Sequence, residues 1–415
     1  DVENTANCYV VNAPGTYSFP LVYGNAINNG QVNYAAYTSK ASIQGTLNPF
    51  INHLGNGITD PYIAKNTDCV PVKAELVWQD APSLVTDIKY NSGTNGGTIS
   101  FKVDKENIRQ GNALIAIKDS QNTILWSWHI WITDENIYHT IKVTNHQNVS
   151  HDLMPIHLGW CEGEVINYAA RSCQVQFIAH GQTRLITVNQ MRSTTSTQGN
   201  CTFYEWGRKD PLRPSSGYAY KNKTWYNAAG IASTANHAVE SFPFGNECIK
   251  NYIRKPDVMQ KEIGGDNTYF NLWNADNNTN SNVYNDNPVT KTVYDPCPVG
   301  FAMPPSNTFT GFTTTGENVT NTVAKYNGEW NSSLPGWNFY CGPNKTGGTI
   351  FFPMTGERIS SGGHLSAVGS LGHTWSATST HSNYAHNLTL YTNYWVWPLD
   401  RFSKSAGHGV RPCLE

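Results

Sequence analysis

The chain has 415 residues, of which 14% are charged and 12% are aromatic, and its formal net charge is −2. This balance gives no basic surface for nucleic acid, and so many aromatic residues argue against a disordered chain. No run of 18 apolar residues occurs, so we expect no membrane-spanning helix, and the low lysine and glutamate content favours strands over helices.

The N-terminal region carries the alternation that predicts β-strands. Ile99, Phe101 and Val103 are each separated by a polar residue, and turns rich in Asn and Gly divide this segment from its neighbours. A longer apolar run at 124–132 predicts another strand. Short strands at this spacing predict a β-sandwich over residues 1–145.

The run at 125–132 contains three tryptophans. Side chains alternate between the two faces of a strand, which separates this run into two sets. The first set is Trp126, Trp128, Ile130 and Ile132, and the second is Ser127, His129 and Trp131. Three close tryptophans can form a surface that stacks on carbohydrate. We favour the other interpretation, in which one face is core and the other packs against a neighbouring domain.

The second region, residues 146–415, combines strand signals with long polar loops. The segments that predict strands are 173–177, 185–188, 374–378, 387–391 and 394–399. Two stretches, 265–287 and 306–345, are rich in Asn, Thr and Gly and predict loops. We therefore expect a mainly β or α+β protein with two domains, the second of which is enlarged by its loops.

The nine cysteines are widely scattered and form neither a CxxC pair nor a zinc-finger pattern. Wide spacing fits long-range disulfides or unrelated buried thiols, and the odd count leaves at least one cysteine unpaired within the chain. Low charge together with Asn-rich loops favours an exported protein. Extracellular localisation is thus an expectation of this composition.

Motifs of catalysis and metal binding are missing from the sequence. There is no Walker A, GxGxxG, HExxH or GxSxG pattern. His151 and His157 are six residues apart, and His381 and His386 are five apart, but neither pair has a clear third ligand. We expect no metal, no cofactor and no enzymatic activity.

One loop combines an aromatic ring with polar oxygens. Trp273, Asn274 and Asp276 lie within four residues, which is typical of sugar-binding loops. The alternative is a polar loop anchored by one tryptophan. The loop lacks the DxDxDG spacing of an EF-hand, so calcium binding is not predicted.

Several segments, taken in order, resemble one family. They are 6–11, 14–17, 111–119, 124–131, YEWGRKDP at 204–211, YDPCPVGF at 294–301, 356–358, GHTWSAT at 372–378 and GHGVRPC at 407–413. This order resembles fimbrillin-like cell-surface and pilus proteins of gut Bacteroidales with a C-terminal Fibrobacter-type major paralogous domain. The resemblance implies a C-type-lectin-like α+β fold for residues 146–415. The family's Met-Asp-Arg-Asn-Leu-Gly junction reads MPIHLG at 154–159 here, so the role of its two charged residues is not carried over.

The resemblance implies a non-enzymatic adhesin at the cell surface or at a pilus tip. Its expected partners are a host or microbial glycan or surface protein and other pilus subunits. Binding is expected through the loops at 266–288 and 307–345. The candidate residues are Trp273, Asn274, Asp276, Trp330, Trp337 and Tyr340, whose aromatic members can equally be core residues.

A lectin-like fold also brings the two ends of its domain together. The resemblance therefore implies a disulfide from Cys161 or Cys297 to Cys413, and we prefer Cys297–Cys413. Such a bond would close a loop of roughly 115 residues and stabilise the fold by about 4 kcal/mol.

Two other functions stay open. One is a structural pilus subunit without a ligand, which would need a donor strand or an open groove, although the C-terminal end shows no spare strand. The other is an enzyme like the formylglycine-generating oxidases, which share the lectin-like fold. That function needs a reactive cysteine pair, and Cys413 near Arg411 is the only hint of one.

Overall fold

The computed structural model describes residues 3–163, 165–196, 198–261, 269–381, 383–392 and 394–415. Strands hold 41% of the chain and helices 7%, which confirms the prediction of a mainly β protein. Among these residues there is one α-helix, α1 (Asn246–Arg254), and no helix is both long and apolar enough to cross a membrane. Short 3₁₀ helices are η1 (Tyr34–Ala36), η2 (Ile63–Lys65), η3 (Thr94–Gly96), η4 (Thr310–Phe312), η5 (Val323–Lys325) and η6 (Pro343–Lys345).

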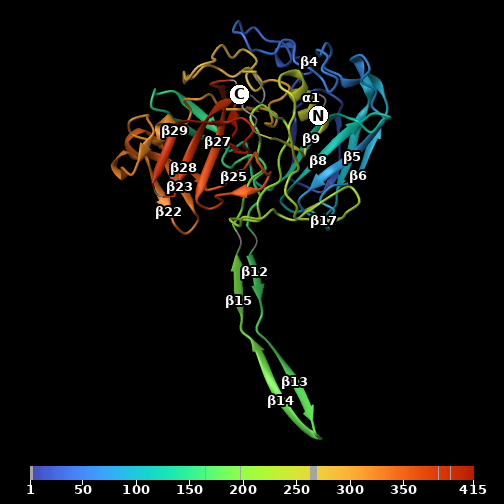
Figure 1. Ribbon diagram of the computed structural model, residues 1–415, viewed down its shortest axis with the longest axis vertical. Helices are drawn as coiled ribbons and strands as arrows, with labels where there is room; N and C mark the ends of the chain where they lie inside the picture. The colour runs from blue at the N-terminus through green and yellow to red at the C-terminus, as the bar shows by residue number, and fades with distance from the viewer. Residues whose placement is uncertain (1–2, 164, 197, 262–268, 382, 393) are drawn as a thin grey trace.

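Two sheets form most of the N-terminal region, which lies on the right of Figure 1. The larger sheet has the order β1 (Cys8–Val11), β9 (Ile124–Ile132), β8 (Gly111–Lys118), β5 (Lys73–Gln79), β16 (Trp225–Tyr226), β17 (Ala232–Ser233). The smaller has the order β2 (Gly15–Pro20), β7 (Thr98–Val103), β6 (Thr86–Asn91), and a separate pair is β3 (Ile27–Asn28) with β4 (Gln31–Val32). The ring of Phe19 in β2 lies 5.0 Å from that of Trp128 in β9, so the two sheets face each other across aromatic side chains.

Strand β9 is buried on both faces. Trp128 points toward β2, whereas the opposite face contacts residues from the second region. Ser127 Oγ donates to Asp210 Oδ1 at 2.7 Å, His129 Nδ1 lies 3.2 Å from the Tyr204 hydroxyl, and Trp131 Nε1 donates to the Trp160 carbonyl at 3.0 Å. The favoured interpretation of this run, core on one face and packing against the second region on the other, is therefore confirmed.

The second region contains three further sheets and several strand pairs (Figure 1). The five-stranded sheet has the order β21 (Val319–Thr320), β29 (Trp395–Ser403), β28 (Tyr384–Tyr391), β27 (Leu371–Ser379), β30 (Gly409–Val410). The three-stranded sheet is β22 (Gly328–Asn331), β23 (Gly336–Gly342), β24 (Thr346–Pro353). The four-stranded sheet is β10 (Ile141–Thr144), β11 (Ser150–Leu153), β31 (Cys413–Leu414), β20 (Phe301–Ala302). Strand pairs are β18 (Val239–Glu240) with β19 (Met259–Gln260) and β25 (Glu357–Arg358) with β26 (Leu365–Ser366).

The two regions share buried side chains. The largest buried cluster includes Trp126 and Trp131 from the first region and Trp206 and Trp375 from the second. The boundary predicted at residue 145 falls in the turn between β10 and β11, which pair with each other. The packing therefore joins the two regions through one continuous hydrophobic core.

A two-stranded arm projects from this body (Figure 1). Near the body it consists of β12 (Val165–Tyr168) paired with β15 (Ser193–Ser196), and farther out of β13 (Arg171–Ala179) paired with β14 (Gln182–Gln190). Every residue of β13 and β14 is exposed. The strands predicted at 173–177 and 185–188 are thus present, but they lie outside the core.

The predicted disulfide between Cys297 and Cys413 is not formed, and all nine cysteines are free. Cys297 belongs to the large shared cluster, whereas Cys413 pairs with Ala302 in the four-stranded sheet and belongs to a second cluster. The two thiols therefore lie in different cores, and the inference from the lectin-like fold was wrong on this point.

Buried charges link the two regions. Lys209 Nζ lies 2.7 Å from Asp210 Oδ2 and donates to the Ser127 carbonyl at 3.0 Å, with both charged side chains almost fully buried. An ammonium group at such a site depends on its carboxylate, because water does not reach it.

We predict that Asp210→Ala lowers the free energy of unfolding by about 3–5 kcal/mol, since it leaves the Lys209 ammonium buried without its partner. Urea denaturation measures this loss. The matched control is Glu240→Ala, which removes the carboxylate of the exposed pair with Lys255 and should cost about 0–1 kcal/mol. Equal losses in the two variants would contradict the structural role assigned to the buried pair.

Candidate functional site

An aromatic surface lies on the five-stranded sheet, at the strands β28 and β29. The rings of Trp395 and Trp397 stack with their centroids 4.6 Å apart and their planes 6° apart. Tyr391 lies 4.8 Å from Trp395 and 6.1 Å from Tyr394. We call Tyr391, Tyr394, Trp395 and Trp397 the aromatic platform. None of the four is buried, and Tyr394 is 52% exposed.

The alternation of β29 explains why the platform faces outward. Val396 is fully buried in the second core cluster, so its two neighbours point to the other face of the sheet. Tyr391 is directly opposite Trp395 in the antiparallel register, which puts their rings on the same face. The sequence shows this signal as Trp-Val-Trp at 395–397, where two large rings flank one small apolar residue. From the sequence we predicted only a strand at 394–399, so the platform was not foreseen.

Polar groups border the platform. Trp397 Nε1 donates to Thr320 Oγ1 at 3.0 Å, and Asn318 Nδ2 donates to the Leu399 carbonyl at 3.1 Å. Thr389, opposite Trp397 in the register, donates its hydroxyl to Asp400 at 2.6 Å, and burial raises the pKa of that carboxyl group. Flat rings beside hydroxyl and amide groups can hold a ligand that has one apolar face and a polar rim.

The predicted site at Trp273 is part of the core. Its indole ring is fully buried, and Nε1 donates to the carbonyls of Arg208 and Tyr294 at 3.3 and 3.1 Å. Asn274 accepts a hydrogen bond from the Thr290 amide, and Asp276 accepts one from the Lys40 amide at 2.9 Å.

These contacts leave the Trp273 ring with no face for a ligand, so the structure corrects its proposed binding role. The side chains of Asn274 and Asp276 instead accept hydrogen bonds from backbone amides outside the loop, at Thr290 and at Lys40 of the N-terminal region.

The other predicted residues lie on the β22–β23 hairpin. Trp337 is 2% exposed and packs against Phe339, so it is also a core residue and its proposed binding role is corrected. Trp330 meets Trp337 edge to face at 5.8 Å, and the Tyr340 hydroxyl donates to Glu329 at 2.8 Å, with Trp330 and Tyr340 both partly exposed. Trp273 and Trp337 belong to different buried clusters, so the predicted residues do not share one core environment.

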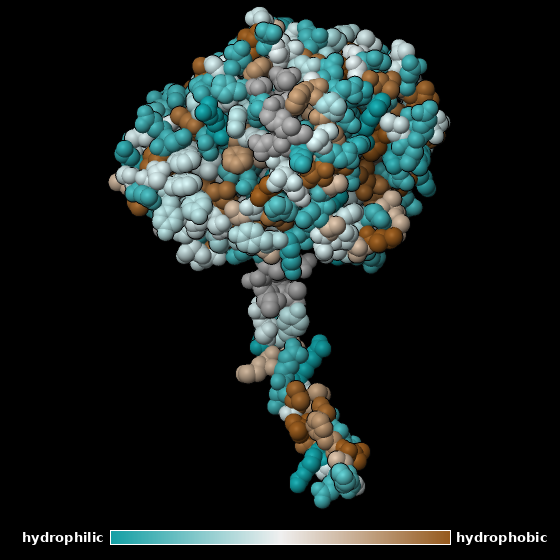
Figure 2. Space-filling view, viewed as in Figure 1, coloured by the Kyte–Doolittle hydropathy of each residue, from teal (hydrophilic) through white to brown (hydrophobic). Residues whose placement is uncertain are grey.

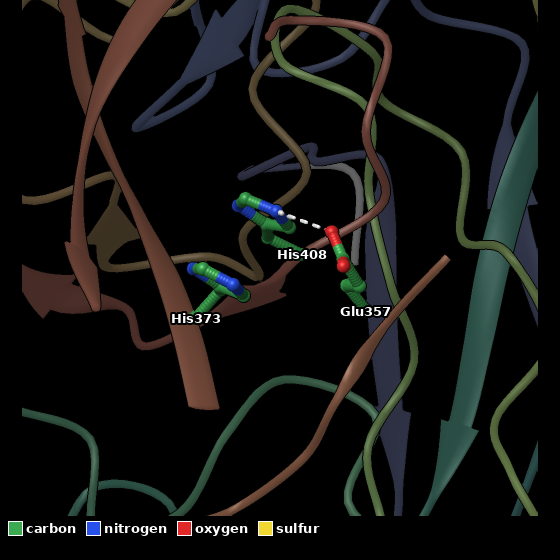
Figure 3. A group of neighbouring side chains, drawn as sticks. All are labelled: Glu357, His373 and His408. Carbon is green, nitrogen blue, oxygen red and sulfur yellow. Dashed lines mark ion pairs between the residues drawn. The ribbon is translucent and has the colours of Figure 1, made fainter. Parts of the chain in front are cut away.

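A second group of side chains lies beneath the sheet surface. Figure 3 shows Glu357, His373 and His408 arranged with the two imidazole rings stacked and the carboxylate at their edge. Their ligand atoms all lie within 4.8 Å of one another, and this is the one group of that kind among the described residues. The ring centroids of His373 and His408 are 4.2 Å apart, and His408 Nε2 is 3.8 Å from Glu357 Oε2.

Both histidines are buried in the interior. Burial lowers the pKa of each well below its ordinary value, and the neighbouring imidazole adds to this effect for His373. His373 Nε2 and both ring nitrogens of His408 have no hydrogen-bond partner within the described chain. Leaving a buried polar atom unpaired costs about 1–3 kcal/mol, so this arrangement calls for an explanation.

The sequence could not indicate this group, because its three members come from separate strands and loops. The histidine pairs considered in the sequence have other environments. His151 lies 3.1 Å from Asp286, His157 contacts Thr374 at 3.1 Å, and His381 lies 3.4 Å from Arg401.

The cysteine required by an oxidase-like enzyme is not activated. Burial raises the pKa of the Cys413 thiol to about 12, which disfavours the thiolate that such chemistry uses. Arg411 donates to the carbonyls of Met154 and Phe351. These contacts give the guanidinium a structural role.

Comparison with protein-family models, curated proteins and solved structures finds no match to this chain. The resemblance to fimbrillin-like proteins therefore remains a prediction from the sequence.

Proposed function

We propose that the chain is a non-enzymatic, extracellular adhesin at a cell surface or pilus, and that it binds glycan through the aromatic platform. The observation that carries the proposal is the outward-facing set of rings on β28 and β29, with Trp395 and Trp397 stacked. This moves the binding surface from the predicted loops to the five-stranded sheet. The fimbrillin-like, lectin-like identity from the sequence belongs to the same proposal.

Glycan is the ligand class that suits these rings. One face of a sugar ring presents C–H groups that pack on an aromatic ring, and its hydroxyl groups need donors and acceptors at the edge. The platform offers stacked indoles, and Asn318 and Thr320 lie at its border. A contiguous patch of apolar side chains with a polar rim usually marks an interaction surface, and here Tyr394 is exposed while Trp395 and Trp397 are half-buried.

The test is a glycan array on the purified chain, followed by affinity measurement for the strongest ligand. We expect Trp395→Ala to weaken binding at least about tenfold, because it removes one stacking surface. Tyr220→Ala is the control, since Tyr220 is 65% exposed and belongs to no part of the platform. Failure to bind any glycan, or equal binding by Trp395→Ala, would contradict the proposal.

The arm favours a second function, that of a subunit in an assembly. One face of the β13–β14 hairpin carries an apolar stretch of Cys173, Val175, Phe177, Ile186 and Val188, with Arg184 opposite Phe177 on the same face. Phe177 is 54% exposed and Val188 is 51% exposed, and Figure 2 shows the apolar residues gathered on the outer half of the arm. The spare hairpin at 165–196 is a feature that the sequence did not lead us to expect.

An isolated hairpin is marginally stable in water, so a covering partner would stabilise the arm. Both strands also present open edges, to which a further strand can add. The segment 165–196 carries Arg171, Arg184 and Arg192 and no acidic residue, in a chain whose net charge is −2. The surface of another copy of the chain could therefore attract the arm.

For this second function we predict concentration-dependent self-association, measured by light scattering after size-exclusion chromatography. Phe177→Ser should weaken it, because the change removes the largest side chain from the apolar face. Gln174→Ser, on the opposite face of the same strand, should have no effect. A chain that stays monomeric at all concentrations, or equal association of the two variants, would contradict assembly through the arm.

A further inference from the structure

The histidine nitrogens of the Glu357–His373–His408 group need a partner that the described chain does not supply. His373 Nε2 and both nitrogens of His408 are buried and have no partner within the described chain, and Glu357 Oε2, at 3.8 Å, is too far from His408 Nε2 for a hydrogen bond. The side chain of Glu357 is 14% exposed, which gives the group a path to solvent. Three potential ligands are therefore gathered at the edge of the interior.

Hydrogen-bonding groups surround one ring nitrogen of His373. Thr389 Oγ1 donates to Asp400 at 2.6 Å and lies 3.0 Å from His373 Nδ1. Asn387 Nδ2 lies 3.1 Å from the same Nδ1 atom and donates to Thr389 Oγ1 at 2.9 Å. The other ring nitrogen, Nε2, is the one that the described chain leaves unpaired. A metal-binding histidine usually has hydrogen-bonded groups at its second ring nitrogen, as Nδ1 has here.

We propose that Glu357, His373 and His408 bind one divalent transition-metal ion of the zinc type. Two imidazoles and one carboxylate form a ligand set that Zn²⁺ accepts, with the fourth position left to water or a ligand. Calcium and magnesium prefer oxygen ligands, which are in the minority here.

Zinc binding requires one imidazole ring to change its orientation. Two ligands of one tetrahedral zinc ion are about 3.3–3.6 Å apart, and His408 Nε2 is already 3.8 Å from Glu357 Oε2. A metal ion lies close to the plane of each imidazole that binds it, whereas these two rings are stacked 8° from parallel. Binding therefore turns one ring about its χ2 torsion. We expect His408 to turn, because no hydrogen bond holds its ring nitrogens, and this movement would break its stacking on Trp375, whose ring centroid is 4.3 Å away.

The experiment is zinc titration of the full chain by calorimetry, with metal content measured after dialysis. The expected result is one Zn²⁺ per chain. Glu357→Gln keeps the size of the side chain and removes its charge, and it should weaken zinc binding at least tenfold, as should His408→Asn. His364→Ala is the control, because His364 is exposed and outside the group.

Cobalt supplies a second readout. A tetrahedral Co²⁺ complex gives visible absorption bands that only an ordered site produces, and these should appear in the wild type and in His364→Ala. No zinc binding, or binding that Glu357→Gln and His408→Asn leave unchanged while circular dichroism shows them folded, would overturn the proposal. Should His408→Asn fail to fold, Glu357→Gln decides the question alone, because its side chain reaches the surface. The glycan test does not depend on this site.

Discussion

The structure depends on a small set of buried cations that donate hydrogen bonds to loop carbonyls. Long irregular segments leave backbone oxygens in the interior that no strand ladder satisfies, and each needs a donor. Arg208 donates to the carbonyls of Val258 and Pro256, and Arg358 donates to those of Arg213 and Gly363. A guanidinium group suits this task because it presents five donors in a fixed plane.

These contacts show where several of the few charged residues of the chain lie. Several of the few charged residues are in the interior, where burial lowers the pKa of Arg411 to about 9 and that of Lys209 to about 8. They donate hydrogen bonds to loop carbonyls and join the two regions. The body held together in this way carries two exposed features, namely the aromatic platform and the arm.

Strands were the part of the fold that the sequence predicted well. The alternation at Ile99, Phe101 and Val103 correctly predicts the buried face of β7, and the alternation at 173–177 correctly predicts part of β13. Alternation shows which face is apolar but not what covers it, and this is why the arm was not foreseen. The shared core depends on contacts between residues such as Ser127 and Asp210, which are 83 positions apart.

The candidate site was predicted less well, because the sequence does not show which side chains are buried by distant segments. The composition of the amide-rich loop around Trp273 predicts a surface loop. In the structure, Asn271 donates a hydrogen bond to the Leu47 carbonyl, and the Trp273 ring is fully buried. Trp395 and Trp397 had a readable signal in their alternation around Val396, whereas Glu357, His373 and His408 meet only through the tertiary fold.

The central claim is that the two regions share one core, and thiol labelling during urea unfolding tests it most directly. Cys8 lies in the first region and Cys201 in the second, and both are buried in the shared cluster. Pulse labelling read by mass spectrometry should show that both thiols become reactive at the same urea concentration. The exposed Cys173 of the arm should react without urea. Separate midpoints for Cys8 and Cys201 would contradict the account, because they would show two cores that unfold independently.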